Sequence, residues 1–389
     1  MDTQFTPVHI RLWNKDFWLL MSAELLISVS VCMLLPTMPR WLFSVEEMNS
    51  AETGIVMGAF GLGLFALGCL CSWLVQHYRR NMVCIWAIVA LILDVAVLWY
   101  FDSLHTRFAG CWLVAAQRFL LGAFFGLAQM VLMSTLIIDT CESEKRTEAN
   151  YSASWFARFA LSLGPLAGLQ VYDAFGFGMV LLTSMGCAAV AVLLIRYVSF
   201  PFRAPEESIS VVSLDRFFLP HGMVLFVNLI LVSCVIGLLL SMQLSAGFYA
   251  LMMGGFLLAV LAQRFVFREA ELKSEVVAGL ILLLAAQLII YNYPQSPVAP
   301  VLIGLGVGLV GSRFLLFFIK LSRHCKRGTS QSTCFLGWEA GLALGIALGY
   351  ALYDGEADGM LRLSVTLTVL SLAFYHFFVH GWFMRNKNR

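Results

Sequence analysis

The chain is 389 residues long, and 60% of its residues are hydrophobic while only 12% are charged. Soluble globular proteins carry roughly 45–50% apolar and about 25% charged residues, so this chain has too few charges to cover a water-facing surface. The composition argues against a soluble enzyme, a nucleic-acid-binding protein and a disulfide-stapled secreted domain. Because a membrane-spanning helix needs roughly 20 residues, the apolar content allows up to about twelve spans.

In chain order, Pro, Gly and charged residues divide the sequence into twelve apolar runs of spanning length. The runs are continuously apolar and do not alternate every second residue, which predicts helices and not the strands of a membrane barrel. The weakest division lies near Gln243, because 219–264 is almost continuously apolar. The predicted spans are 17–39, 51–75, 82–101, 109–138, 150–172, 175–195, 219–242, 244–264, 275–293, 297–320, 331–353 and 360–383.

The Lys and Arg residues are distributed unevenly between the two sides of these spans. If both termini are inside, nineteen of the 25 Lys and Arg residues fall in cytoplasmic segments, and three more lie within spans. Only Arg40, Arg107 and Arg362 fall outside. Because positive charge is retained on the cytoplasmic side, this bias predicts an even number of spans and cytoplasmic termini in the cell inner (plasma) membrane. A cleaved signal peptide is not expected, because the first apolar run follows Asp16 and not a basic segment.

The longest polar break in the sequence, 199–218, divides the chain into two blocks of six spans each. We interpret it as a cytoplasmic linker with a short surface helix at 213–219. The linker separates an N-terminal half, 1–198, from a C-terminal half, 219–389. The predicted fold class is therefore an all-α integral membrane protein of twelve helices in two pseudo-symmetric halves.

The two halves repeat each other when residues from Lys145 onward are shifted by 181 positions. Parallel six-helix halves are a transporter architecture, in which the substrate binds between the halves near the middle of the membrane. A looser match places Glu24 of the first span over Asn228 of the seventh. The closer matches pair Lys145-Arg146 with Lys326-Arg327, Gly164 with Gly345, Gly168 with Gly349, and Tyr172-Asp173 with Tyr353-Asp354.

Small residues form one stripe on each of two repeated spans, the fifth and the eleventh. In the eleventh span Gly337, Gly341, Gly345 and Gly349 recur every fourth residue, which suits close helix packing. Glu339 lies two residues from Gly337, about 200° around the helix, so it is expected to point away from the packed stripe. In the fifth span Ala160, Gly164 and Gly168 form the matching stripe, and Arg158 lies two residues before it.

Ionisable residues at membrane depth cost roughly 2.5–3.5 kcal/mol each and therefore need a reason. Arg158 and Glu339 occupy equivalent positions in the repeats, so we expect them to face each other across a cavity and to bind substrate or couple to protons. The alternative is a buried ion pair that only fixes helix orientation. Six ionisable residues stand out at membrane depth: Glu24, Asp94, Arg118, Arg158, Arg313 and Glu339.

Glu24 is the best candidate for a protonatable acid, with the polar Ser28 one turn further on. Because low dielectric favours the neutral form of a carboxyl group, proton binding and release could accompany movement between conformations. The alternative is a permanently protonated acid that bonds to a neighbouring helix. Asn228, in the matching place of the seventh span, is a further site candidate.

For two arginines within spans, Arg118 and Arg313, the sequence allows two roles each. Arg118 supplies a fixed cation that would favour proton release from a nearby carboxyl group, or it pairs with Asp94 of the preceding span. Arg313 lies towards the cytoplasmic end of the tenth span, where it either joins the site or extends to the membrane surface. His376 and His380 are four residues apart, but with no further ligand nearby no metal site is predicted.

The chain resembles the major facilitator superfamily over essentially its whole length. The stretch at Arg118 and Gly122 resembles the family's motif B, and the resemblance implies that this Arg takes part in proton transfer. The stretch at Gly164, Pro165 and Gly168 resembles motif C, the antiporter signature. Pro165 lacks an N–H, so we also expect a bend there, either as a hinge or as a permanent kink.

The loop after the second span resembles the family's motif A. Gly68 and Arg80 match it, whereas Gln76 stands in place of its acid and Arg79 in place of a Gly. The resemblance implies a proton-coupled exporter of small, amphipathic molecules that is not an enzyme. It would act as a monomer in the lipid bilayer, with the proton gradient and no bound cofactor, metal or nucleic acid. The alternative is a proton-coupled importer of a small anionic nutrient, siderophore or peptide.

Overall fold

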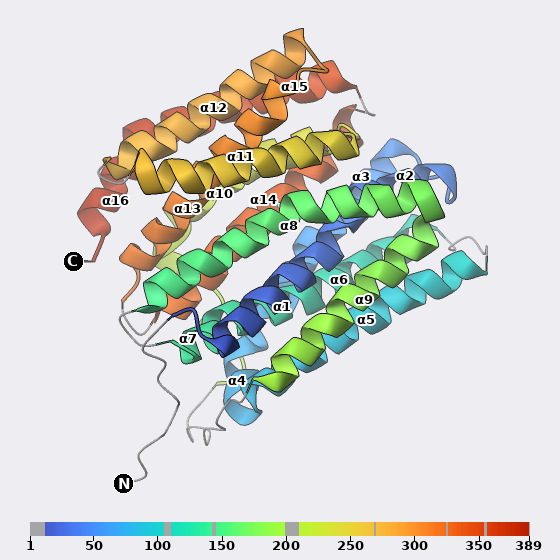
Figure 1. The fold of residues 1–389 in the computed structure, drawn as a ribbon, viewed down its shortest axis with the longest axis horizontal. Coiled ribbons are helices and arrows are strands. Elements are labelled where there is room, and N and C mark those ends of the chain that lie inside the picture. Colours follow the sequence, from blue (N-terminus) through green and yellow to red (C-terminus); the bar gives the residue numbers. More distant parts are fainter. Residues whose placement is uncertain are drawn as a thin grey trace.

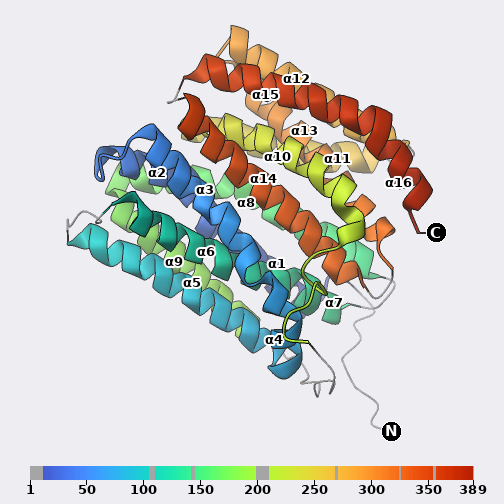
Figure 2. The same cartoon turned by 180° about the vertical axis from the view of Figure 1, so that it is seen from behind.

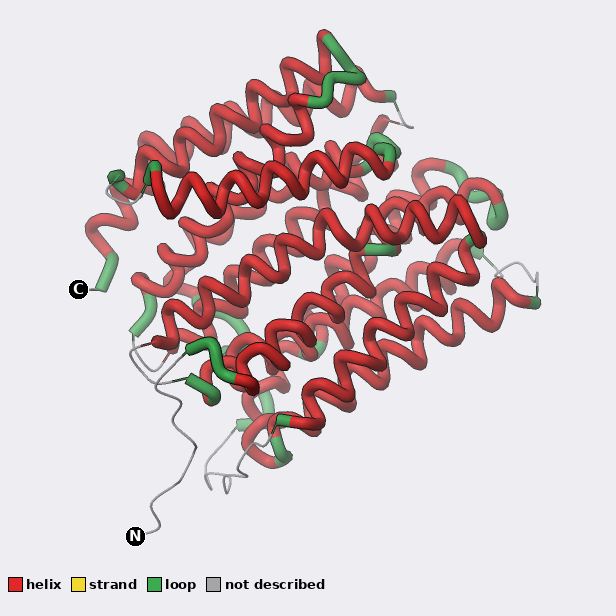
Figure 3. The backbone as a smooth tube through the Cα atoms, viewed as in Figure 1, coloured by secondary structure: helices red, strands yellow, loops and turns green. Residues whose placement is uncertain are grey.

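The computed structural model describes residues 12–104, 110–141, 145–198, 210–267, 270–323, 326–353 and 356–388, and every regular element in this part of the chain is helical. Eleven of its helical segments are long and apolar enough to cross a membrane. The remaining predicted span corresponds to α8 (Arg146–Phe175), which is as long but is interrupted by polar residues such as Arg158. The long helices lie side by side and are joined by short connections (Figure 3).

Each of the twelve predicted spans overlaps one straight or broken helix. The N-terminal half contains α1 (Lys15–Cys32), α2 (Leu34–Ser44), α3 (Ser50–Ala66), α4 (Cys71–His77), α5 (Arg80–Ser103), α6 (Cys111–Val131), α7 (Ile137–Asp139), α8 and α9 (Phe177–Tyr197). The C-terminal half contains α10 (Met223–Leu240), α11 (Ala246–Phe265), α12 (Leu272–Asn292), α13 (Val298–Leu321), α14 (Arg327–Tyr353), α15 (Ala357–Phe374) and α16 (His380–Asn386).

Local sequence signals explain several helix boundaries. The Asn14 side chain caps α1 by accepting a hydrogen bond from the backbone N–H of Phe17 at 2.9 Å. Asn49 and Glu52 form a reciprocal capping box at the start of α3. Gln243, with φ of 52°, lies in the turn between α10 and α11, so the division predicted there is confirmed.

Small residues allow the helices of each half to approach closely. A Cβ atom added at Gly345 of α14 would collide with the backbone of α10, and one at Gly168 of α8 would collide with the backbone of Met33 in the first span. The two predicted stripes are therefore confirmed as packing surfaces. The fifth span packs on the first exactly as the eleventh packs on the seventh, which agrees with the internal repeat.

Prolines in two spans have different effects on their helices. The first span is broken at Met33 between α1 and α2, where Pro36 has no N–H for the carbonyl of the preceding turn. The Thr37 hydroxyl donates instead to the Met33 carbonyl at 2.8 Å. By contrast, α8 continues through Pro165 as one α-helix, so the motif C proline does not interrupt its helix.

The linker differs from the surface helix predicted at 213–219. Residues 199–209 lie outside the described residues, and the stretch that follows is a turn in which Arg216 has φ of 59°. Within the turn the Phe218 N–H donates to the Leu214 carbonyl at 3.0 Å. The backbone also bonds to neighbouring helices: Ser213 N–H donates to the Cys69 carbonyl at 3.0 Å, and Arg216 N–H donates to the Thr329 hydroxyl at 2.8 Å. Figure 2 shows this stretch passing from α4 towards α10.

The beginning of α1 and the end of α16 lie at the same end of the bundle (Figure 1). The Asn388 N–H donates to the carbonyl of Lys320 at the end of α13, at 2.9 Å. An even number of crossings is consistent with this arrangement.

Candidate functional site

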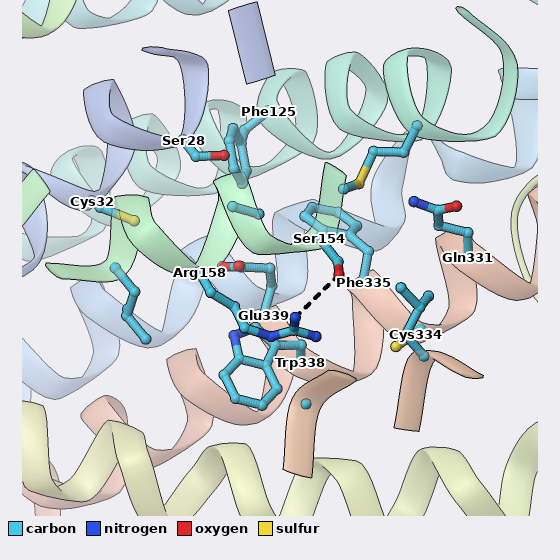
Figure 4. A pocket seen from close by; sticks show the side chains of 15 residues that line it. Ser28, Cys32, Phe125, Ser154, Arg158, Gln331, Cys334, Phe335, Trp338 and Glu339 are labelled. Carbon is cyan, nitrogen blue, oxygen red and sulfur yellow. Dashed lines mark hydrogen bonds between the residues drawn. The ribbon is translucent and has the colours of Figure 1, made fainter. Parts of the chain in front are cut away.

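A cavity of about 70 Å³ lies between the two halves of the bundle (Figure 4). It is lined from the N-terminal half by α1, α6 and α8, and from the C-terminal half by α13 and α14. Sites for drug-sized ligands measure roughly 300–1,000 Å³, so the cavity is small in this conformation. Its wall includes Ser28, Phe125, Arg158, Gln331, Trp338 and Glu339.

Contacts between the halves lie on both sides of this cavity along α14. Before the cavity-lining stretch 331–339, Gly328 packs against Ser134 of the fourth span. After it, the alanines of α14 pack closely on α3, where Gly54 and Gly61 leave room for them. The halves therefore meet at both ends of the site, and opening to either side requires one set of these contacts to separate.

Arg158 and Glu339 line the same cavity, as the internal repeat suggested. The Nη1 of Arg158 donates to the Ser154 hydroxyl at 3.1 Å, and its guanidinium lies 5.2 Å from the centre of the Trp155 ring. Glu339 forms no hydrogen bond or ion pair with any described residue, Arg158 included. Arg158 and Glu339 therefore do not form the structural ion pair that was the alternative prediction.

Glu24 does not line the cavity itself but is hydrogen-bonded to Ser28, which does. It is fully buried, and its Oε1 accepts a hydrogen bond from Ser28 at 3.2 Å. Gln129 donates to the same Ser28 hydroxyl at 3.0 Å, while Oε2 of Glu24 has no partner among the described residues. Because Ser28 itself lines the cavity, the acid communicates with the site through a single hydroxyl group.

Arg118 is a buried cation with few partners. It is 1% exposed, and Nε and Nη1 form no hydrogen bond with described residues. Its Nη2 lies 4.0 Å from the Met57 sulfur, and the guanidinium is 5.3 Å from the centre of the Phe60 ring. The alternative pairing with Asp94 is not formed, since that carboxylate accepts a hydrogen bond from Gln117 at 2.7 Å.

A second cavity, of about 10 Å³, places Arg118 beside the central site. Its wall includes Arg118 from the N-terminal half and Glu339 from the C-terminal half. Glu339 also lines the central cavity, so this carboxylate lies between the two arginines predicted from sequence. No ion pair connects Glu339 with Arg118 in the described structure.

The structure does not bring Asn228 and Arg313 to the cavity. The Nδ2 of Asn228 donates to the Ser371 carbonyl at 3.1 Å, so this side chain joins α10 to α15 inside the C-terminal half. Arg313 pairs with the buried Glu275 at the start of α12. Each side chain turns towards a partner within its own half, which is why neither is available to the central site.

A polar network around Gln263 and the buried Gln331 were not among the sequence candidates. Gln263 bonds to Glu275 and Ser312 within the C-terminal half, and the Tyr151 hydroxyl of the N-terminal half donates to it. Gln263-Arg264 is the second-half counterpart of the loop that resembles motif A, so that signal was present. No sequence pattern marked Gln331; its role is visible only from its neighbours in the structure.

The remaining motif residues lie at helix contacts outside the cavity. Gly122 of α6 packs on the backbone of Phe60 in α3, and Gly68 packs under the Phe217 ring of the linker. Arg80 at the start of α5 pairs with Asp139 at the end of the fourth span. Gly164 and Gly168 of α8 likewise pack on the first span, at Cys32 and Met33.

Solved structures with this fold cover almost the whole chain. The human organic anion transporter MFSD10 has a TM-score of 0.66 at 16% identity, with 92% of this chain and 98% of that chain covered. The nucleoside transporter NupG has a TM-score of 0.68 at 14% identity and covers 94% and 100%. The POT family transporter PepTSo has a TM-score of 0.69 at 12% identity and covers 96% and 99%.

These likenesses confirm the fold class predicted from sequence, the twelve-helix fold of major facilitator transporters. All three of these structures are of transporters. No protein-family model and no curated protein matches the sequence. At identities of 12–16% the likeness extends to the fold and not to substrate or direction.

Proposed function

We propose that the chain is a secondary transporter that exports a small amphipathic molecule in exchange for protons. The observation that carries this proposal is a cavity between two six-helix halves, lined by Arg158 and Glu339 and linked through Ser28 to Glu24. Alternating access would separate the contacts between halves first on one side of the site and then on the other. On this proposal the protein acts as a monomer in the inner membrane, with both termini cytoplasmic.

Glu24 is proposed as the proton carrier. A carboxyl group that is fully buried favours its neutral form, and Oε2 has no hydrogen bond to stabilise a charge. The Ser28 hydroxyl connects it to the cavity, through which water or substrate could exchange a proton. Movement that brings a cation or water nearer to this carboxyl group would release the proton.

Arg118 is proposed as the cation that drives this release. It shares the wall of a small cavity with Glu339 but forms no ion pair with any acid in the described part of the chain. An unpaired buried guanidinium is costly, so a second conformation in which it meets a carboxylate would be favoured. The export direction rests on the resemblance of Gly164, Pro165 and Gly168 to motif C.

A proton-coupled importer of a small anion is the second candidate. One observation favours it: Arg118 and Arg158 are both near the site and neither is neutralised by an ion pair with a described acid. An anionic substrate would supply the missing charge. The sign of proton movement distinguishes this candidate from the exporter.

Inverted membrane vesicles with an acidic lumen provide the test, with a pH-sensitive dye as the readout. An exporter exchanges lumenal protons for a compound added outside, so the pH gradient collapses on addition of ethidium, phenylalanine or benzoate, depending on substrate class. A symporter collapses it only when the compound is preloaded in the lumen. Collapse only on preloading would overturn the export proposal.

Glu24→Gln tests the carrier within the same assay. We expect pH-driven exchange to be lost while exchange of labelled for unlabelled compound, which needs no net proton movement, continues. The control is Asp94→Asn, an acid in the membrane that lies away from the cavity and bonds to Gln117. Full pH-driven exchange in Glu24→Gln would remove Glu24 from the mechanism.

A further inference from the structure

The central cavity presents a cation and a carboxylate that are not paired with each other. Arg158 comes from α8 of the N-terminal half and Glu339 from α14 of the C-terminal half (Figure 4). Ser154 and the Trp155 ring hold the guanidinium in place but offer it no negative charge. Glu339 has no hydrogen bond or ion pair with a described residue. Two opposite charges therefore remain uncompensated in one site.

A third polar group of the same cavity also lacks partners. Gln331 is 2% exposed, and both Nε2 and Oε1 form no hydrogen bond with described residues. Buried polar groups are normally hydrogen-bonded, and leaving one unsatisfied is costly. The rest of the wall is largely apolar, with Phe125 and Trp338 among its aromatic residues. The site thus combines two charges that lack an ion-pair partner among the described residues, and one unsatisfied amide, with an apolar surface.

The charge pattern discriminates between classes of ligand. An anion would neutralise Arg158 but would lie near the like charge of Glu339, and a cation would satisfy Glu339 but meet Arg158. A neutral ligand would leave both charges unpaired in a water-poor site, where an isolated charge is most costly. A molecule that carries both charges compensates both side chains at once.

We propose that the cavity binds a small zwitterion with an apolar body, whose carboxylate pairs with Arg158 and whose ammonium group pairs with Glu339. This inference rests on the transport function proposed above and names its substrate class. The amide of Gln331 would bond to the polar end, and the aromatic wall would pack on the apolar body. Because the two charged residues belong to different halves, a zwitterion contacts both halves and favours their closure around it, whereas a singly charged ligand engages only one.

Matched sets of compounds test this assignment on the purified full-length chain. Each set contains an amino acid, the amine without its carboxylate and the acid without its ammonium group. The sets are phenylalanine, phenethylamine and phenylpropionate; tryptophan, tryptamine and indolepropionate; and leucine, isopentylamine and methylpentanoate. We expect at least one zwitterion to bind about tenfold or more tightly than both of its singly charged relatives, because each lost charge-assisted hydrogen bond has about that effect.

Two variants test which residue binds which charged group of the ligand. Glu339→Gln is expected to remove the advantage of the zwitterion over the acid, and Arg158→Gln its advantage over the amine. The control variants Asp94→Asn and Arg40→Gln also remove one charge each, but neither residue lines the cavity, so the preference should be unchanged. Thermal unfolding of every variant shows whether it is folded before binding is compared.

Each outcome bears on the proposal. Tighter binding of an amine or an acid than of its zwitterion, absence of binding by every zwitterion, or an unchanged preference in both cavity variants would overturn it. Binding of zwitterions without pH-driven exchange in vesicles would leave the substrate class intact and refute the proton-coupled function. The reverse result, pH-driven exchange of a singly charged compound only, would refute the substrate class and leave the transport function standing.

Discussion

Arg118→Met is expected to stabilise the protein and abolish proton-coupled transport. The side chain is 1% exposed, and two of its nitrogen atoms, Nε and Nη1, have no hydrogen-bond partner among described residues. Each unsatisfied buried donor costs about 1–3 kcal/mol. The contact with the Phe60 ring at 5.3 Å offsets about 1–2 kcal/mol of this cost. Met fills similar apolar space, so the expected gain in free energy of unfolding is about 1–4 kcal/mol.

Thermal unfolding of the purified variant in detergent measures the gain in stability. The vesicle assay measures transport by the same variant. A rise of several degrees in apparent melting temperature is expected, at roughly 2–4 °C per kcal/mol. Arg40→Met is the control: its partner Asp173 is 65% exposed, so the pair contributes little. A melting temperature that falls, or transport that persists, would show that Arg118 is a structural residue and refute the reasoning.

Four further predictions follow from other contacts. Gly345→Leu should lower the free energy of unfolding by about 1–3 kcal/mol, because a side chain there meets the α10 backbone, whereas Gly254→Leu, with open space around its Cα, should leave the melting temperature unchanged. Asp94→Asn should keep transport and change stability by less than about 1 kcal/mol, since its Oδ2 bonds only to Gln117; loss of transport would contradict this. Arg313→Gln should destabilise more than Glu275→Gln in chemical unfolding, because the Glu275 side chain is fully buried while that of Arg313 is 19% exposed; equal effects would argue against the pair. Tyr151→Phe should speed labelling of the cavity cysteine Cys334 by a thiol reagent added on the side of the membrane where Tyr151 lies, because it removes a hydrogen bond between the halves; an unchanged labelling rate would contradict this.

The helices and their closest contacts could be predicted because they depend on local sequence. Continuous apolar runs of spanning length gave all twelve spans, and glycines spaced four apart marked the contacts of α8 and α14 with the first and seventh spans. Arg158 and Glu339 were placed in one cavity by the internal repeat. Their positions opposite the packed stripes follow from helix geometry alone.

What sequence could not give depends on the rotation and neighbours of individual side chains. Asn228 aligns with Glu24, yet it turns towards Ser371 of α15 and stays inside its half. A short surface helix was expected at 213–219 of the linker, but the left-handed Arg216 and its hydrogen bond to Thr329 hold this stretch as a turn against α14. The unsatisfied amide of Gln331 becomes visible only when every neighbour is known.

Two ion pairs, one in each half, show why a comparison of residue identities between the halves misses part of the repeat. In the N-terminal half a cation at the start of the third span, Arg80, pairs with an acid on the fourth, Asp139. In the C-terminal half an acid at the start of the ninth span, Glu275, pairs with a cation on the tenth, Arg313. The two ion pairs occupy related places in the two halves, but the positions of the acid and the base are exchanged. The repeat therefore keeps an ion pair at this place without keeping the same residues.

Charge compensation within each half separates structural from functional charges. Arg80, Asp139, Glu275 and Arg313 are neutralised by partners in their own halves. The charges that face the other half, Arg118, Arg158 and Glu339, form no ion pair with a described residue. A buried charge without a partner is costly. On the function proposed above, the substrate compensates Arg158 and Glu339, and Arg118 acts on the proton that Glu24 carries.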